Sequence, residues 1–255
     1  MSEEAEKLAE GTLISHLLEL RARLLRAIVA VGIAIAPCLY YSNELFTFVA
    51  QPLLDKLPDG AALVATTVVG GFMVPFKLAV FVGLFVAMPY VLYQLWAFVA
   101  PGLYRREKRF AIPLLITSII LFYCGVAFAY FAVFPVMFEF FAHTTPLGVR
   151  MMTDIGSYLS FVLTMFLAFG AAFEMPIAVV LLALTGLVSV EKLGSQRGFV
   201  LIGIFVIAAI LTPPDAISQT IMAVPMYLLY EGGLIMARIL IRMRGQTAPA
   251  GKQGA

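Results

Sequence analysis

Six apolar runs constrain this chain more than any other feature. Crossing about 30 Å of hydrocarbon takes about 20 helical residues. Four runs reach or approach that length, at residues 24–41, 72–100, 110–142 and 155–188, and two shorter runs follow at 199–211 and 216–236. Hydrophobic residues make up 62% of the chain and charged residues 13%, about half the charged share of a soluble domain. The chain is therefore predicted to be a polytopic membrane protein.

We expect an all-α fold with six transmembrane helices in a single domain over residues 1–244, and a disordered tail over 245–255. Proline lies inside or at the edge of nearly every run and tends to bend a helix, which predicts a kinked, concave bundle. The fifth run has 13 residues, about 20 Å of helix, and the sixth starts with polar residues and soon meets Glu231. The fifth and sixth helices are therefore predicted to be short.

The distribution of Lys and Arg predicts the orientation, because cytoplasmic loops of membrane proteins retain these residues. Of the 17 basic residues, 14 lie before or in the first turn of the first run, between the second and third, between the fourth and fifth, or after the sixth. Lys56, Lys77 and Arg150 are the three that remain. This alternation predicts that both termini lie on the cytoplasmic side.

Motifs of soluble enzymes are missing from the sequence. It contains no phosphate-binding glycine loop, no HExxH and no GxSxG. The only histidines, His16 and His143, are predicted on opposite faces of the membrane and so cannot share a metal ion. We expect no catalytic residue, no metal, no cofactor and no nucleic-acid partner. Any work that the chain performs needs an energy source other than its own ATP hydrolysis.

Two clusters predicted at the cytoplasmic surface each place one glutamate among several cations. Residues 16–23 contain Glu19, and residues 103–109 contain Glu107. One interpretation is local, because Glu19 and Arg23 are four residues apart and can pair on one helix. The other interpretation is that each of the two carboxylates binds one guanidinium group of a ligand, since arginine and carboxylate pair bidentately.

Glu174 is the only charged residue between positions 155 and 188 and lies near the middle of that run. A charged side chain in hydrocarbon costs on the order of 3 kcal/mol, so function is the default interpretation. Three roles stay open: a protonated acid bonded within its own bundle, a contact for a polar side chain of a partner helix, and a proton relay. Glu231, near the end of the sixth run, is expected at the membrane interface.

The two clusters occur together with residues 94–101 (QLWAFVAP), 157–161 (SYLSF), 173–176 (FEMP) and 211–215 (LTPPD). In this order these segments closely resemble TatC, the polytopic subunit of the twin-arginine protein translocase, from about residue 12 to residue 240. The resemblance implies a receptor in a bacterial-type cytoplasmic (inner) membrane. Such a receptor recognises paired-arginine signal peptides and exports folded proteins with the protonmotive force and the single-span partners TatA and TatB. Contact with membrane lipids and self-association in a larger complex are implied as well.

The resemblance also implies roles for single residues. By position, Glu19 and Glu107 match the glutamates of the family's signal-peptide site. Arg21, Phe98 and Tyr104 are expected to belong to the same site.

Other positions match the family outside that site. Pro52 and Asp215 match functional positions in the external loops. Glu174 and Gln219 match polar positions in the fourth and sixth helices, where partner helices are thought to dock.

Two other classes of membrane protein are alternatives. A proton-coupled small-molecule transporter would also use an acid within the membrane, but the inverted repeats that favour this class are not evident in the six runs. An intramembrane hydrolase would need a nucleophile motif, which the sequence lacks.

Overall fold

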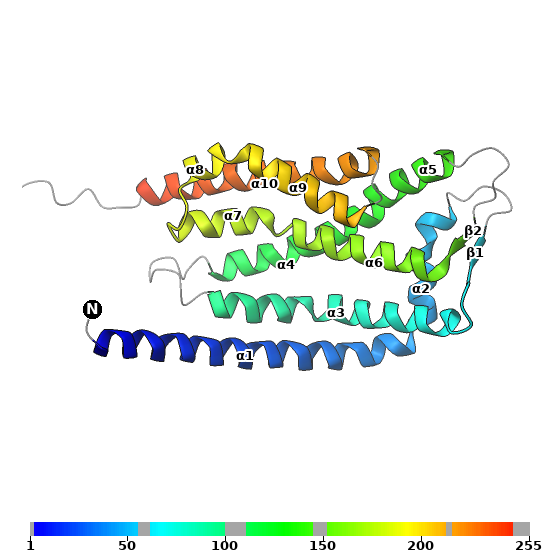
Figure 1. Ribbon diagram of the computed structural model, residues 1–255, viewed down its shortest axis with the longest axis horizontal. Helices are drawn as coiled ribbons and strands as arrows, with labels where there is room; N and C mark the ends of the chain where they lie inside the picture. The colour runs from blue at the N-terminus through cyan, green and yellow to red at the C-terminus, as the bar shows by residue number, and fades with distance from the viewer. Residues whose placement is uncertain (1–2, 56–61, 100–110, 145–151, 213–215, 247–255) are drawn as a thin grey trace, which may run out of the picture. The chain divides into compact units, whose positions relative to one another are not determined.

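The computed structural model describes residues 3–55, 62–99, 111–144, 152–212 and 216–246, which are helical almost throughout (Figure 1). Five stretches are long and apolar enough to cross a membrane: Leu17–Tyr40, Gly70–Phe98, Ile112–Thr144, Ile155–Leu184 and Ala216–Met243. Helix α9 (Arg197–Leu211) is also apolar but has only 15 residues. The all-α class is thus confirmed. The count of six spans stays a prediction, because α9 is shorter than an ordinary span.

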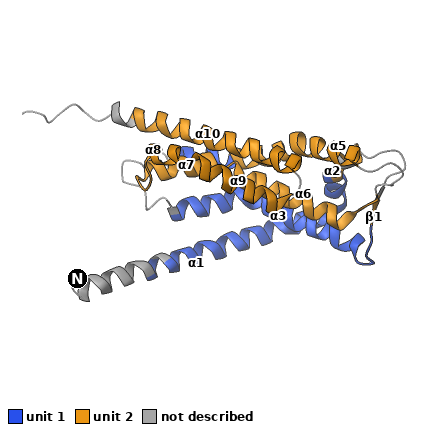
Figure 2. Ribbon diagram, turned by 45° about the horizontal axis from the view of Figure 1, so that its top comes forward, with its two compact units in different colours: residues 1–49, 65–119 blue, residues 50–64, 120–255 orange. Residues whose placement is uncertain are grey.

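The contacts divide the chain into two compact units, coloured separately in Figure 2. Unit 1 comprises residues 1–49 and 65–119, and unit 2 comprises residues 50–64 and 120–255. The single domain over residues 1–244, the kinks and the concave shape stay predictions. Of the expected tail, residues 247–255 lie outside the described residues.

Unit 1 is built on two antiparallel helices, α1 (Glu3–Tyr40) and α3 (Gly70–Val99). A Cβ atom on Gly83 would lie 2.6 Å from Ile35 Cγ1 and 2.8 Å from Ile35 Cα, so the missing side chain lets the α1 backbone approach. Towards the other end, Arg23 contacts Gln94. Because the residue numbers run in opposite senses along this contact, the helices are antiparallel.

In unit 2 a π-helical turn interrupts the third apolar run. The run consists of α4 (Ala111–Phe128), η3 (Ala129–Val133) and α5 (Phe134–Thr144). Within it the Phe134 N–H donates to the Ala129 carbonyl, five residues back. Pro135 follows directly; it has no N–H, and its ring crowds the carbonyl four residues earlier. The wider turn relieves that conflict within a continuous helical stretch.

Aromatic rings form the core between this run and α6 (Ile155–Ala172). The ring centroids of Phe134 and Phe166 lie 5.2 Å apart, and those of Phe128 and Phe169 lie 5.8 Å apart. Phe134 and Phe169 are fully buried. Gly125 admits this packing, because a Cβ there would overlap the Phe169 carbonyl. Rings at these separations contribute about 0.5–1.5 kcal/mol per pair beyond the area they bury.

The fourth apolar run is two helices, because α6 ends at Ala172 and α7 (Met175–Leu184) starts after a two-residue break. Pro176 occupies the first turn of α7, where the missing N–H costs no helical bond. Helix α10 (Ala216–Gln246) packs on α7 at this level. A Cβ on Gly233 would lie 2.8 Å from Pro176 Cα, so the two backbones are in close contact.

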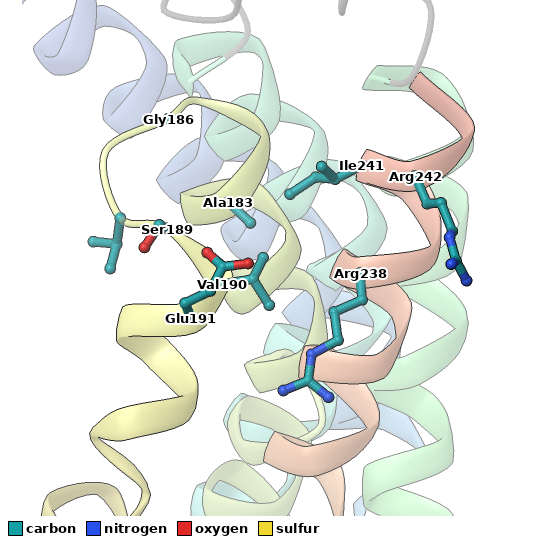
Figure 3. Close-up of a pocket in the computed structure, with 9 residues that line it drawn as sticks. Ala183, Gly186, Ser189, Val190, Glu191, Arg238, Ile241 and Arg242 are labelled. Atoms are coloured by element: carbon teal, nitrogen blue, oxygen red, sulfur yellow. The ribbon is translucent and has the colours of Figure 1, made fainter. Parts of the chain in front are cut away.

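A tight turn joins α7 to the short helix α8 (Val190–Ser195) (Figure 3). Gly186 adopts φ +71°, which a residue with a side chain rarely does. Its N–H bonds to the Ala183 carbonyl at 3.2 Å. Ser189 Oγ then caps α8 by accepting from the Lys192 N–H at 3.2 Å. The positive φ of Gly186 and the Ser189 cap therefore fix the conformation of the connection between α7 and α8.

The prediction of a short sixth helix was wrong, because α10 (Ala216–Gln246) has 31 residues. The prediction placed the sixth run at 216–236 and judged it short because its uninterrupted apolar residues stop at Glu231. A helix continues past a polar residue whose side chain is bonded or reaches water; here Glu231 is paired with Arg197, and Arg238 is exposed. The fifth helix, α9, is short, as predicted.

The connection between the first two spans is more ordered than a loop. It contains α2 (Ser42–Leu54) and the strand β1 (Ala62–Val64). The strand pairs in parallel with β2 (Met152–Asp154), with Ala62 opposite Met152. Pro52, expected in a loop, lies within α2, and its side chain is outside the described part of the chain.

Gly232 and Gly233 form a matched pair for testing the contact between α7 and α10. A Cβ on Gly232 meets nothing within 4 Å, whereas one on Gly233 would collide with Pro176. We expect Gly233→Ala to lower the free energy of unfolding by about 1–3 kcal/mol through overpacking. Gly232→Ala is expected to be neutral or to stabilise by up to about 1 kcal/mol through helix propensity. Thermal unfolding in detergent measures both, and equal melting temperatures for the two variants would contradict the close packing.

Candidate functional site

Glu19 lies on α1 in a hydrogen-bonded cluster that reaches α3. Arg23, one turn further along α1, donates to Glu19 Oε1 from Nε at 3.0 Å and from Nη2 at 2.6 Å. Its Nη1 reaches Gln94 Oε1 at 3.4 Å. The side chain of Glu19 is 38% exposed, whereas Gln94 is buried. The pairing of Glu19 with Arg23 is thus confirmed, and it also links the two helices of unit 1.

The Glu19 carboxylate keeps capacity for a further donor. An ionised carboxylate offers about four lone-pair positions on its two oxygens. Both bonds from Arg23 fall on Oε1, and among the described residues no hydrogen bond falls on Oε2. Arg23 and Gln94 fix the position of the acid. The cluster is therefore a positioned carboxylate on which a second guanidinium can dock.

The other residues of the expected signal-peptide site differ in where they lie relative to Glu19. Phe98 follows Gln94 by four residues on α3, so both lie on the same helix face, and Phe98 is half-buried. Arg21 is exposed and lies about 200° around α1 from Glu19, on nearly the opposite side. Tyr104 and Glu107 lie outside the described residues, so the two-carboxylate fork stays a prediction.

Glu174 occupies the break between α6 and α7, as the N-cap residue of α7. Its N–H bonds to the Ala171 carbonyl at 3.1 Å, and its carbonyl accepts from the Ala178 N–H at 3.0 Å. The residue is half-buried, and Oε1 is shielded from solvent. The N-terminal end of a helix carries a partial positive charge, which favours a carboxylate there. The break thus places this acid at the start of α7 inside an apolar span, and its side chain makes no cap hydrogen bond there.

Gln219 belongs to the same unit but lies far from Glu174 along the helices. It is half-buried in the first turn of α10, next to the fully buried Ser218. Gly233, which contacts the start of α7, follows 14 residues later, or about 21 Å along α10. Asp215, the remaining loop position, lies outside the described residues.

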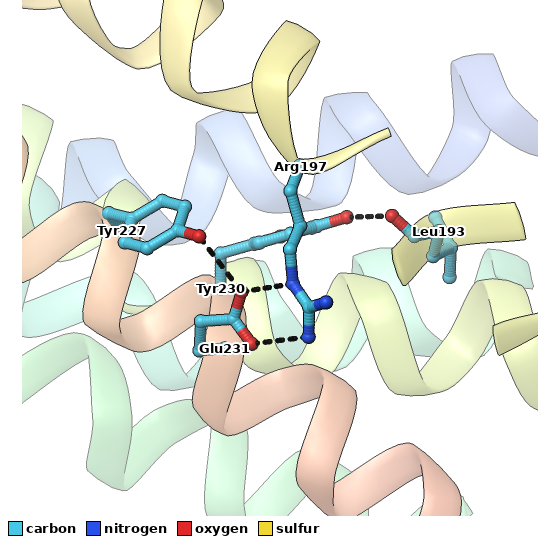
Figure 4. Close-up of polar contacts among 5 residues, drawn as sticks. All are labelled: Leu193, Arg197, Tyr227, Tyr230 and Glu231. Atoms are coloured by element: carbon cyan, nitrogen blue, oxygen red, sulfur yellow. Dashed lines mark hydrogen bonds and ion pairs between the residues drawn. The ribbon is translucent and has the colours of Figure 1, made fainter. Parts of the chain in front are cut away.

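A second polar cluster joins α9 to α10 (Figure 4). The Arg197 guanidinium pairs bidentately with the Glu231 carboxylate. Nε donates to Oε1 at 2.5 Å, and Nη2 donates to Oε2 at 2.9 Å. The Tyr227 hydroxyl donates to Oε1 of the same carboxylate at 3.0 Å. Tyr230 donates to the Leu193 carbonyl of α8 at 2.6 Å. The middle of α10 is thereby bonded to both α8 and α9.

Sequence reasoning placed Glu231 at the membrane interface but missed its partners. The missed signal is helical spacing: at 100° per residue, Tyr227, Glu231, Arg238 and Arg242 fall within about 60° of one another on α10. They form a polar stripe on an otherwise apolar helix. Gln94 was also missed as a site residue, although it opens one of the segments that carry the family resemblance.

Ligands for a metal ion do not converge in the part of the chain that the structure describes. No group of three or more His, Cys, Asp or Glu side chains there could hold a metal. Cys38 and Cys124 are free thiols, the first buried and the second exposed.

Comparison with known proteins gives one consistent result. The family model for Sec-independent protein translocase protein (TatC) matches residues 15–225. The TatC protein of Azotobacter chroococcum mcd 1 is 52% identical over 242 residues, covering 95% of this chain and 94% of the relative. That of Escherichia coli strain K12 is 49% identical over 229 residues, covering 90% and 89%. A crystal structure of a twin arginine translocase receptor TatC matches with a TM-score of 0.80 at 38% identity, over 89% of this chain and all of that one.

The ion pair between Arg197 of α9 and Glu231 of α10 predicts that exchanging the two charges restores the stability that either single reversal removes. Arg197→Glu and Glu231→Arg each place like charges together, so each variant is expected to melt below the parent protein in detergent. The double variant restores opposite charges and is expected to recover most of the lost melting temperature. Tyr227→Phe removes one of three bonds to the carboxylate and serves as the milder control. Additive losses in the double variant would show that the pair does not join the two helices.

Proposed function

The chain belongs to the TatC family of Sec-independent protein translocase proteins, and from that membership we propose that it is the signal-peptide receptor and core subunit of a twin-arginine translocase. The resemblance inferred from the motifs is confirmed. Relatives named as translocase components indicate a transport role, and the apolar helices make the chain an integral membrane protein. In the proposal it exports folded proteins, driven by the protonmotive force.

The proposed location is a bacterial-type inner membrane with both termini in the cytoplasm. The 14 basic residues that cluster in alternate gaps support this orientation. In this orientation Glu19 lies near the cytoplasmic end of the first span, where an exported protein arrives. The protonmotive force enters the proposal from the family resemblance. The missing phosphate-binding loop supports only an energy source other than ATP hydrolysis by this chain.

The observation that carries the receptor role is the positioned Glu19 carboxylate. Arg23 and Gln94 hold it, and its second oxygen is available within the described residues for a guanidinium of the signal peptide. In the proposal Glu107 supplies the second acid, and Tyr104 and Phe98 line the site. Arg21, on nearly the opposite side of α1 from Glu19, is not placed in contact with the same guanidinium. A charged hydrogen bond contributes about 1.5–3 kcal/mol, so two forks alone bind weakly.

The remaining affinity is assigned to the apolar segment of the signal peptide. Exposed apolar side chains continue along α1 beyond the acid, among them Val29 and Ile33, which are 60% and 71% exposed and lie within about 80° of Glu19 around the helix. An apolar peptide segment packed there would be shielded from water. The proposed binding mode is therefore a charged anchor at Glu19 followed by apolar contact along the span.

Glu174 and Gln219 are proposed to receive the helices of the single-span partners TatA and TatB. Both are half-buried polar residues in apolar helices, and a polar contact in lipid stabilises by about 0.6–2 kcal/mol. A partner helix that crosses about 30 Å of hydrocarbon is long enough to reach the depth of Glu174 and that of Gln219. Self-association of the chain in a larger complex completes the proposal, since six helices do not enclose a folded cargo domain. Pro52 and Asp215 are proposed functional positions on the external side.

Reversal of the Glu19 charge tests the receptor role. We expect Glu19→Lys to abolish capture and export of paired-arginine cargo, because it places a cation where the peptide's guanidinium docks. Glu19→Gln keeps the shape but removes the charge and is expected to weaken peptide binding about tenfold or more. Site-specific photocrosslinking of a paired-arginine signal peptide measures capture.

Glu44→Lys, which reverses an exposed acid in the first turn of α2, is the matched control. Added salt should weaken capture by the parent protein, since exposed charges are screened over about 8 Å at physiological ionic strength. Normal export of paired-arginine cargo by Glu19→Lys would place the receptor site elsewhere.

Neutralisation of Glu174 tests partner docking separately. We expect Glu174→Gln to reduce crosslinking of TatA or TatB helices to α7 while signal-peptide capture persists. Thr164→Val is the control, because this exposed hydroxyl bonds to the Ser160 carbonyl of its own helix. If crosslinking and transport are unchanged in Glu174→Gln, the acid is structural.

A further inference from the structure

A pocket of about 570 Å³ opens in unit 2 between the α7–α8 turn and the last turns of α10 (Figure 3). This volume lies within the range of small-molecule sites. Its walls combine apolar side chains with both signs of charge. The lining residues are Ala183, Gly186, Val188, Ser189, Val190, Glu191, Arg238, Ile241 and Arg242.

The backbone forms one wall of this pocket without needing a ligand. The positive φ of Gly186 and the bond from its N–H to Ala183 shape the turn, and Ser189 caps α8. On the facing wall, Arg238 reaches across to α8, since a Cβ on Gly194 would lie 3.5 Å from Arg238 Nη2. The site is therefore pre-formed.

The pocket lies where two apolar spans end together. One span ends at Leu184, just before the turn, and the other at Met243, just beyond Arg242. Such ends coincide with the level of lipid headgroups, where long basic side chains extend towards phosphates. A ligand there meets apolar side chains on one side and charges on the other.

The charges of the pocket match a headgroup that carries both signs. Arg238 and Arg242 lie one turn apart on α10, and neither pairs with a carboxylate among the described residues. Glu191 stands on the opposite wall, at the start of α8 (Figure 3). A carboxylate there opposes a purely anionic ligand but suits an ammonium group.

We propose that this pocket binds the headgroup of a membrane aminophospholipid. The phosphate diester lies at Arg238 and Arg242, the ammonium group lies at Glu191, and the acyl chains leave along Ile241 and Val190. This site is distinct from Glu19, in unit 1, and from the Glu174 break.

The test titrates the purified full-length chain, stripped of lipid in detergent, with dioleoyl phosphatidylethanolamine or dioleoyl phosphatidylglycerol, and native mass spectrometry reads the bound lipid. The parent chain is expected to prefer the ethanolamine lipid. Combined Arg238→Gln and Arg242→Gln is expected to lower affinity for both lipids about tenfold or more. Glu191→Gln is expected to abolish the preference while phosphate binding persists.

Lys192→Gln is the matched control, because Lys192 is exposed on α8 beside the pocket but does not line it. Unchanged lipid affinity in the double arginine variant would overturn the proposal, as would a preference of the parent chain for the glycerol lipid. Inorganic phosphate that displaces either lipid at equal concentration would identify a soluble-anion site instead. Should the double variant fail to fold, Glu191→Gln and the phosphate competition still decide the outcome.

Discussion

Hydrocarbon offers no hydrogen bond to a peptide group, so a chain inside a membrane must satisfy its own backbone. The irregular points of this chain obey that constraint. At the π turn the Phe134 N–H finds the Ala129 carbonyl, and in the α6–α7 break Phe173 and Glu174 donate to carbonyls of α6. The break therefore loses little backbone bonding. What it adds is a polar residue, Glu174, at the point within an apolar span where one helix ends and the next begins.

Two other acids of the spans, Glu19 and Glu231, are bonded to arginine side chains. Arg23 binds Glu19 and reaches α3, and Arg197 binds Glu231 and so joins α9 to α10. In lipid, apolar contact alone discriminates poorly between one helix register and another, because lipid tails are as apolar as the side chains. Each arginine therefore does two things at once: it neutralises the charge of a glutamate, and through its bond to Gln94 or Glu231 it favours one register between two helices.

The spans could be predicted from sequence because their length and apolarity are set by the membrane itself. Glu19 and Arg23 could be paired because four-residue spacing on a helix is a local property. The partnership of Gln94 and Arg23, or of Arg197 and Glu231, depends on which helices become neighbours, and a single sequence does not state that. The length of α10 was underestimated for a related reason. Apolar residues delimit the part of a helix in lipid, whereas its bonded polar residues let it continue beyond.

Helix α10 shows how one element can serve several tasks without conflict. Its glycine at position 233 lets it lie against the start of α7, which sets the surroundings of the Glu174 break. Its polar stripe points another way, since Glu231 is two positions before Gly233, or about 200° around the helix. On that side Glu231 meets Arg197, and two turns further on Arg238 reaches α8. A change on the stripe is thus separated from the α7 contact by the width of the helix, and the partner-docking and lipid sites can be tested independently.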